Sequence, residues 1–290
     1  MPLEPSELVS LLDLERLEDG LYRGRQPEHS RLARVYGGQV MAQALMAACR
    51  SVHESRFVHS LHAYFLLGGD PSIPIVYDVE RIRDGGSFST RRVAARQHGE
   101  VIFYMTASFH KTESGYEHQD AMPDVPSVDA TAQMENLAGF SSEDAKFGWA
   151  EEWSALDMRY IGDNRDADDP DRALHPAKQQ LWIRARGELP DDQVLHRCVL
   201  TYISDLTLLG SSLRPHAVGI DSPTIQSASL DHSMWFHHPV QAGAWHLYDQ
   251  GSPAAVGARG LGTGRIFSQD GVLVATVAQE GLIRAVKKPV

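Results

Sequence analysis

The sequence contains two series of similar segments, one following the other. The matching pairs are 35–45 with 201–211, 60–65 with 229–236, and 98–108 with 270–280. In this alignment Tyr36 corresponds to Tyr202. A repeat of this length indicates duplicated domains, because the repeats of solenoid proteins span only about 20–45 residues. The chain is therefore expected to fold as two similar halves.

Each series combines a helical pattern with several strand-like segments. The predicted helices are 5–17 and 35–52 in the first series and 191–216 in the second. The predicted strands of the first series are 20–25, 57–67, 73–84, 87–99 and 101–111. Those of the second series are 155–162, 178–189, 225–238, 244–253, 257–271 and 272–286. Glycine-rich turns separate the strands as in hairpins, so each half is expected to be α+β, with a helix and an antiparallel meander.

Residues 112–150 lack the periodicity of either series. They include Pro123, Pro126 and several serines and aspartates, a composition typical of a linker. We therefore predict a first domain over residues 1–111, a linker over 112–150 and a second domain over 151–290.

Composition favours a globular cytoplasmic protein. The 290 residues are 42% hydrophobic and 22% charged, and no apolar run reaches the roughly 20 residues that span a bilayer. The acidic N-terminus is unlike a signal peptide, and Cys49 and Cys198 fall in helical patterns, as reduced core cysteines do. The formal charge of −11 argues against nucleic acid as a partner. Five arginines between residues 81 and 96 fit either a phosphorylated small molecule or a solvated strand face.

The predicted helix 191–216 carries one continuous apolar stripe. Its members are Leu195, Cys198, Val199, Tyr202, Leu206, Leu209 and Leu213. Asp191 and Asp192 precede the helix as cap and first-turn acids, and Arg214-Pro215 is expected to end it. Asp205 lies on the stripe, where a carboxylate is costly unless it is hydrogen-bonded or used in chemistry. On this pattern alone, a structural aspartate bonded to a neighbouring strand is the commoner outcome.

The rest of the repeat strengthens the case for chemistry in the second half. The alignment places Asp205 opposite Gln39, Ser229 opposite Ser60, and Gln279 opposite Ala107. Reaction-capable groups therefore gather in the second series only. A purely structural polar core would give little reason for such a difference.

Several long motifs resemble the acyl-CoA thioesterase II family. They are DGGSFSTRRVAARQHG (84–99), FYMTASF (103–109), LDHSMWFHHP (230–239) and QDGVLVATVAQEGLIR (269–284). The resemblance covers nearly the whole chain and is weakest at 112–150. It implies a double hotdog: two tandem domains, each a long helix wrapped by a curved antiparallel sheet.

The resemblance also implies an activity and the residues that carry it. Members of the family hydrolyse fatty acyl-CoA thioesters, and their catalytic trio falls on Asp205, Ser229 and Gln279. Bacterial members have Thr where this chain has Ser229, which keeps the hydroxyl and loses a methyl. These groups would hold one water against a medium- or long-chain acyl-CoA, with no metal or cofactor, because a thioester is already activated. A backbone N–H near Gly37-Gly38 is expected to polarise the thioester oxygen.

Other interpretations stay open at this stage. An enoyl-CoA hydratase of the same fold pairs an aspartate with a histidine five residues on, but position 210 is Gly210. A non-catalytic acyl-CoA-binding or assembly subunit would not need the three polar groups. His59, on the equivalent strand of the first half, is the next candidate base if Asp205 is not one.

The remaining motifs are weaker. His232, His237 and His238 invite a zinc site, yet no carboxylate–histidine frame accompanies them. GARGLG at 257–262 resembles a dinucleotide loop only superficially, and no G-x-S-x-G elbow occurs. Open sheet edges invite pairing, so a homo-oligomer, either a dimer or a tetramer, is expected.

Overall fold

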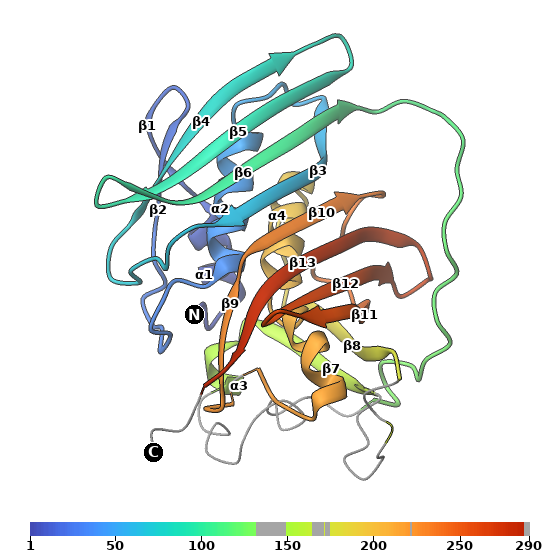
Figure 1. Cartoon of the computed structure of the whole chain (residues 1–290). Coiled ribbons are helices and arrows are strands. Elements are labelled where there is room, and N and C mark those ends of the chain that lie inside the picture. Colours follow the sequence, from blue (N-terminus) through green and yellow to red (C-terminus); the bar gives the residue numbers. More distant parts are fainter. Residues whose placement is uncertain (132–148, 164–170, 172–174, 221, 287–290) are drawn as a thin grey trace.

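The structure, a computed structural model, describes residues 1–131, 149–163, 171, 175–220 and 222–286. Its strands join into one antiparallel sheet that curves around the helices (Figure 1). The strands of the first half are β1 (Glu15–Glu18), β2 (Leu21–Gly24), β3 (Arg56–Phe65), β4 (Ile75–Asp84), β5 (Phe88–Gln97) and β6 (Glu100–Lys111). Those of the second half are β7 (Leu156–Asp163), β8 (Ala177–Ala185), β9 (Ile225–Ser229), β10 (Asp231–Phe236), β11 (His246–Val256), β12 (Arg259–Ser268) and β13 (Leu273–Ala285).

Five helical segments accompany the sheet in the described residues. They are α1 (Pro5–Leu12), α2 (Gly37–Cys49), α3 (Trp149–Glu152), α4 (Gln193–Ser204) and the 3₁₀ helix η3 (Leu209–His216). Helices α1, α2 and α4 contribute to one continuous hydrophobic core with both halves of the sheet. No helix in these described ranges has both the length and the apolar character needed to cross a bilayer.

The strand order repeats on the two sides of the central β3–β10 pair. Outward from this pair the order is β3-β6-β5-β4-β2-β1 on one side and β10-β13-β12-β11-β8-β7 on the other. β3 and β10 run antiparallel, with His62 opposite Ser233. Two equivalent sets of strands thus form one sheet, as the sequence repeat predicts. The domain limits at residues 111 and 151 stay a prediction, because the sheet continues through both halves.

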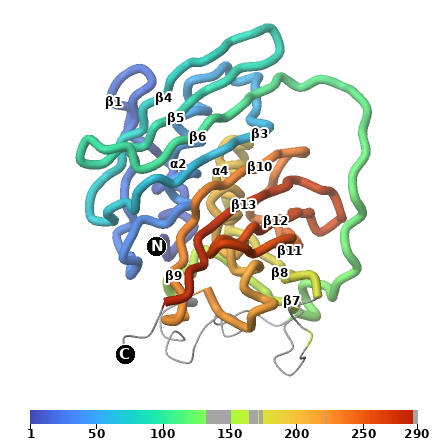
Figure 2. Tube along the Cα trace, in the orientation of Figure 1, coloured from blue at the N-terminus to red at the C-terminus, as the bar shows by residue number. Residues whose placement is uncertain are grey.

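Residues 112–131 contain neither helix nor strand, in agreement with their linker composition. Figure 2 shows this segment leaving β6 and running along the outside of the molecule towards the second half. The rest of the predicted linker, residues 132–148, lies outside the described residues.

The prediction of a single helix over 191–216 is wrong. Asp192 caps α4 as expected, its carboxylate accepting the N–H of Val194 at 2.8 Å. However, α4 ends at Ser204, and residues 205–208 form turns before η3 begins. The stretch around the break contains Asp205, Thr207, Gly210, Ser211 and Ser212, all poor helix formers. Pro215, expected to end the helix, lies inside η3.

The two helical segments have different partners. Helix α4 packs on α1 and α2 of the first half. In contrast, η3 packs on β8, β11, β12 and β13, just as α2 packs on β2, β4, β5 and β6. The structural counterpart of α2 is therefore η3 with the turns before it, which agrees with the alignment of 35–45 with 201–211.

The glycine-rich segment 257–262 is a packing feature. Gly257 and Ala258 form the two-residue turn between β11 and β12, and both have positive φ, as a hairpin turn of this length favours. A Cβ on Gly260 would lie 2.3 Å from Ser212 Oγ, and a Cβ on Gly262 would lie 2.8 Å from the Leu208 carbonyl oxygen. These glycines let η3 and the turns before it approach β12 closely.

The predicted strand 225–238 is divided at Leu230. β9 pairs with β13 only, whereas β10 pairs with both β13 and β3. The Leu230 N–H donates to the Glu280 carbonyl, and its own carbonyl accepts the N–H of Phe65. The division places Ser229 at the end of β9, next to the junction of the two halves.

Candidate active site

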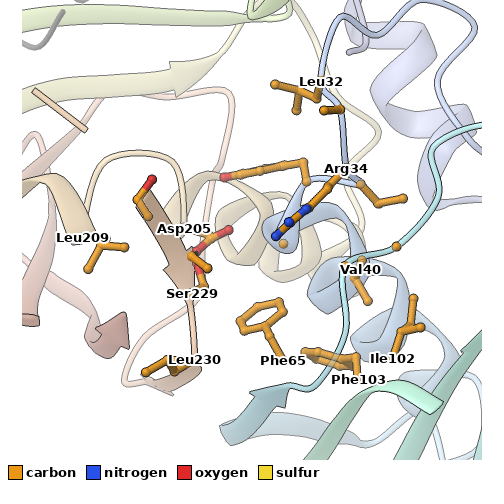
Figure 3. Close-up of a pocket in the computed structure, with 18 of the residues that line it drawn as sticks. Leu32, Arg34, Val40, Phe65, Ile102, Phe103, Asp205, Leu209, Ser229 and Leu230 are labelled. Atoms are coloured by element: carbon orange, nitrogen blue, oxygen red, sulfur yellow. Dashed lines mark hydrogen bonds between the residues drawn. The ribbon is translucent and has the colours of Figure 1, made fainter. Parts of the chain in front are cut away.

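Asp205 lies where the C-terminal end of α4 meets the N-terminal end of α2 (Figure 3). A Cβ on Gly37 would lie 2.7 Å from Asp205 Oδ2, and a Cβ on Gly38 would lie 2.5 Å from the Tyr202 carbonyl oxygen. A side chain at either position would therefore hold the two helix ends apart. The glycine pair brings the positive end of the α2 dipole to a carboxylate from the other half.

The three residues expected from the family resemblance are in hydrogen-bond contact. Gln279 Nε2 donates to Asp205 Oδ1 and, at 3.0 Å, to Ser229 Oγ. Ser229 Oγ donates to Asp205 Oδ1 at 3.3 Å. The pairing of β9 with β13 sets this arrangement, because it places Ser229 opposite Gly281, two residues from Gln279. Asp205 thus is hydrogen-bonded to neighbouring strands, which a structural aspartate would also be.

The environment of Asp205 opposes its charge. Burial raises the pKa of its carboxyl group, while hydrogen bonds from Gln279, from the backbone N–H of Gly38 and from Ser229 act in the opposite direction. The net effect is a pKa above the ordinary value. The N–H of Gly38 donates to Asp205. It therefore does not act as the donor to the thioester oxygen that was expected near Gly37-Gly38.

Two tyrosine hydroxyls donate hydrogen bonds to carbonyl oxygens at the C-terminal end of α4. Tyr36 Oη donates to the Tyr202 carbonyl at 2.7 Å, and Tyr248 Oη donates to the Ser204 carbonyl at 2.8 Å. Burial raises the pKa of both donors well above its usual value, so both remain neutral donors. Their hydroxyl protons satisfy carbonyl oxygens at the C-terminal end of α4, where the helix itself supplies no donor.

Asp205 and Ser229 line an open pocket of about 850 Å³. Much of its wall is apolar and comes from both halves: Leu32, Val40, Phe65, Leu66, Leu67, Ile102, Phe103, Leu209, Ile220 and Leu230. Arg34, from the loop before α2, also lines the pocket and extends its guanidinium towards the centre (Figure 3). Gln279 is fully buried behind Asp205 and Ser229. The pocket combines a long apolar wall with a small polar group at one point, as ligand sites commonly do.

The arginine cluster does not form a shared basic face. Arg91 is buried and pairs with Asp84 at 2.9 Å. Arg81 pairs with Asp19, also at 2.9 Å, and Arg92 pairs with Glu80. The positive charges of these three arginines are therefore divided among separate carboxylates.

The candidate histidines are dispersed. His237 Nε2 lies 2.9 Å from Thr276 Oγ1, whereas His232 is buried beside Ser204. Within the described part of the chain, no group of three or more potential ligands could hold a metal ion. His59 lies 2.8 Å from Ser108 Oγ and lines a different hollow from Asp205, so it is poorly placed to replace Asp205 as a base.

Sequence reasoning missed the residues that support Asp205 from behind. In the sequence Tyr36 stands out only as the match of Tyr202 in the repeat, and no pattern marks Tyr248. His232 was considered only as a metal ligand, although its Nδ1 lies 3.8 Å from Asp205 Oδ1. The one available signal is that Asp231-His232-Ser233 begins two residues after Ser229, in a motif of the family.

Known proteins give a consistent identification. The family model described as acyl-CoA thioesterase matches residues 172–282, and that of the acyl-CoA thioesterase N-terminal domain matches 26–110. The chain is 44% identical over 295 aligned residues to acyl-coenzyme A thioesterase 8 of Mus musculus, covering 96% of this chain and 88% of the relative.

Solved structures agree. An acyl-CoA thioesterase II from Mycobacterium marinum superposes with a TM-score of 0.82 at 46% identity, covering 97% of this chain and 99% of that one. A protein with a hot dog fold from Alicyclobacillus acidocaldarius superposes with a TM-score of 0.76 at 20% identity, covering 98% of both chains, which supports the fold alone. The predicted α+β double hotdog is confirmed. The chain belongs to the acyl-CoA thioesterase family and is an acyl-CoA hydrolase.

Proposed function

We propose that this enzyme hydrolyses medium- to long-chain fatty acyl-CoA by direct attack of a water held by Asp205, Ser229 and Gln279. The observation that carries the proposal is the contact among these three side chains at the wall of an apolar pocket. Gln279 is fully buried and holds both Asp205 Oδ1 and Ser229 Oγ through Nε2, so it fixes the two groups that face the pocket and the water.

The reaction needs one proton to move twice. Asp205 takes a proton from the water as the water oxygen bonds to the thioester carbon, and the carbonyl electron pair moves to oxygen. When that pair returns, the C–S bond breaks and the CoA thiolate takes the proton from Asp205. Gly37, at the N-terminal end of α2, lines the same pocket. We assign the backbone N–H of Gly37 as the donor to the developing oxyanion.

The pocket favours a long acyl chain with a charged carrier. Its apolar wall extends from Leu209 and Leu230 to Phe65 and Ile102, across both halves of the chain. Arg34 places a positive charge in the same pocket, which suits the phosphates of coenzyme A in a chain of net charge −11.

The first prediction is that the full-length protein releases thiol from acyl-CoA substrates of about C8–C16 in the presence of a chelator. The three polar groups and an activated ester suffice for hydrolysis without a Lewis acid. Thiol release is followed with a chromogenic disulfide, and free fatty acid is measured in parallel. Absence of thiol release across the series would overturn the proposal, whereas release abolished by the chelator would overturn its metal-free mechanism.

The second prediction concerns pH. Burial raises the pKa of Asp205, and only the ionised carboxylate can accept the proton of water. Activity should therefore fall as the pH falls through this raised pKa, at a pH above the ordinary aspartate value of about 3.9. The measurement is kcat/KM against pH with a substrate of fixed chain length. A profile that stays flat down to pH 4 would contradict Asp205 as the base.

The third prediction separates the partners of Asp205 from Asp205 itself. Ser229→Ala and Gln279→Ala each remove a hydrogen bond that orients water and carboxylate but leave the base in place. Each variant is expected to lose about 10- to 100-fold in kcat. Ser229→Thr restores the hydroxyl and is expected to stay close to wild type. A loss in Ser229→Thr as large as that in Ser229→Ala would show that the hydroxyl is not what matters at this position.

Two further expectations stay predictions. A homo-oligomer, dimer or tetramer, is expected because β1 and β7 end the sheet with unpaired edges in the described residues. A cytoplasmic location is expected because Cys49 and Cys198 are free thiols, as in a reducing compartment.

A further inference from the structure

His232 lies behind Asp205 and has no part in the chemistry described so far. It stands in β10, and its imidazole is completely buried. Nδ1 lies 3.8 Å from Asp205 Oδ1, and Nε2 lies 3.0 Å from Ser204 Oγ. Burial lowers the pKa of His232 to about 3, so the ring is neutral at working pH and carries a single N–H.

The neighbouring hydroxyl fixes which nitrogen carries that proton. Ser204 Oγ lies 2.8 Å from the Thr201 carbonyl oxygen. A carbonyl oxygen can only accept, so the Ser204 hydroxyl uses its one proton there. The contact between Ser204 Oγ and His232 then requires donation from Nε2. Nδ1 is left with a bare lone pair, and within the described residues it has no hydrogen-bond partner.

We propose that His232 is a positioning residue whose Nδ1 accepts a hydrogen bond from Asp205 once Asp205 has taken the proton of the attacking water. The inference rests on the proposed function, in which Asp205 is that base. A lone pair directed at an ionised carboxylate opposes the charge, but the same lone pair accepts the O–H of the neutral acid. His232 therefore makes Asp205 a stronger base.

The role of His232 involves no change in its own charge. The proton moves from water to Asp205 and later from Asp205 to the thiolate, while the proton on Nε2 stays with Ser204 as its acceptor. Nδ1 and Asp205 Oδ1, which lie 3.8 Å apart, must approach by about 1 Å to reach an ordinary hydrogen-bond length of about 2.7–3.0 Å.

The other groups around Asp205 do not offer an equivalent. Tyr36, before α2, and Tyr248, in β11, both donate to carbonyls of α4, and burial raises the pKa of each. Arg34 lines the pocket from the first half, and its guanidinium carries only donors and no acceptor for the O–H of a neutral acid. If the fall of kcat/KM at low pH (the acid limb of the pH profile) changes when His232 is altered, these neighbours therefore do not explain the change.

The tautomer is tested in the wild-type full-length protein. With ¹⁵N-labelled histidine, a two-bond ¹H–¹⁵N correlation spectrum distinguishes a protonated Nε2 from a protonated Nδ1. The expected result at neutral pH is a proton on Nε2 and a bare Nδ1 for His232, assigned by its loss in His232→Leu or, if that variant does not fold, by sequence-specific assignment. A proton on Nδ1 would overturn the proposal whatever the variants do.

The effect on chemistry is tested with Ser204→Ala. Without Ser204 Oγ the ring is free to place its proton on Nδ1 and donate to the Asp205 carboxylate. The acid limb of kcat/KM is expected to move to lower pH by about 0.5–1 unit, with about a tenfold loss of turnover. In a His232→Leu background, Ser204→Ala should move the acid limb no further.

His246→Leu is the matched control, because His246 is another buried neutral histidine and lines a different hollow. Its acid limb should equal that of the wild type. An acid limb unmoved in Ser204→Ala, or moved equally in His246→Leu, would overturn the proposal. Absence of thiol release by the wild type would instead contradict the proposed function, and the tautomer measurement would still decide the state of His232.

Discussion

Asp205→Asn is expected to lower kcat by about 10²–10⁴-fold, the largest effect of any single substitution in the pocket. The amide matches the carboxylate in volume but cannot accept the proton of the attacking water. Because Gln279 Nε2 donates to Asp205 Oδ1, the Asn side-chain oxygen can still accept this hydrogen bond. The measurement is single-substrate turnover with a medium-chain acyl-CoA.

A stability measurement provides the control for this variant. A carboxyl group whose folded-state pKa is raised contributes its stability below the unfolded-state pKa, and that contribution is lost as the pH rises through the folded-state pKa. Burial raises the pKa of Asp205, so at neutral pH its ionised form destabilises the fold. Asp205→Asn should therefore have an equal or higher Tm at neutral pH. A folded variant that keeps more than about a tenth of wild-type turnover would place the base elsewhere.

Gly38→Ala should both destabilise the protein and reduce its activity. The added Cβ would lie 2.5 Å from the backbone carbonyl oxygen of Tyr202, and backbone cannot move aside as a flexible side chain can. The expected cost is about 1–3 kcal/mol or more of unfolding free energy. The N–H of Gly38 would also be displaced from Asp205, so kcat should fall in the molecules that remain folded.

Gly86→Ala is the matched control for Gly38→Ala. A Cβ on Gly86 would have no heavy atom within 4 Å, so the same change in chain flexibility occurs without a clash. Denaturant unfolding and turnover are measured for both variants. Equal stability of Gly38→Ala and Gly86→Ala would show that α2 and α4 can separate without cost, and that the close approach of their ends is not needed.

The regular parts of the fold could be predicted from the sequence. Alternation and turn residues place β2 to β13 within a few residues, and the repeat predicts two equivalent halves, whereas β1 falls largely within the helix predicted over 5–17. The break after Ser204 could not be predicted, because the apolar stripe continues through it with helical spacing and outweighs the poor helix formers between Asp205 and Ser212. What divides the helix is that α4 packs on α2 while η3 packs on the second half of the sheet, and such long-range partners leave no local pattern.

The candidate site could be predicted from the sequence only in part, for the same reason. Family resemblance supplied Asp205, Ser229 and Gln279, and the contact among them agrees with that assignment without testing their roles. The Gly37-Gly38 pair, predicted from the sequence to lie near the thioester oxygen, also lets α2 approach the end of α4 closely. The position of the proton on His232 follows from the contact of β10 with the end of α4, where the Ser204 hydroxyl donates to the Thr201 carbonyl, and a long-range contact of this kind leaves no local sequence pattern.

The pairing of β3 with β10 has a consequence for how the molecule tolerates change. The two halves share a row of backbone hydrogen bonds and a common interior, so the described part of the linker, 112–131, serves as a tether and adds no strand to the sheet. A substitution at Gly38, in the first half, should therefore change the surroundings of Asp205, in the second half. Although the chain contains two similar domains, neither can change independently of the other. Substitutions at the contact between the two halves should therefore be tolerated less well than substitutions elsewhere in either half.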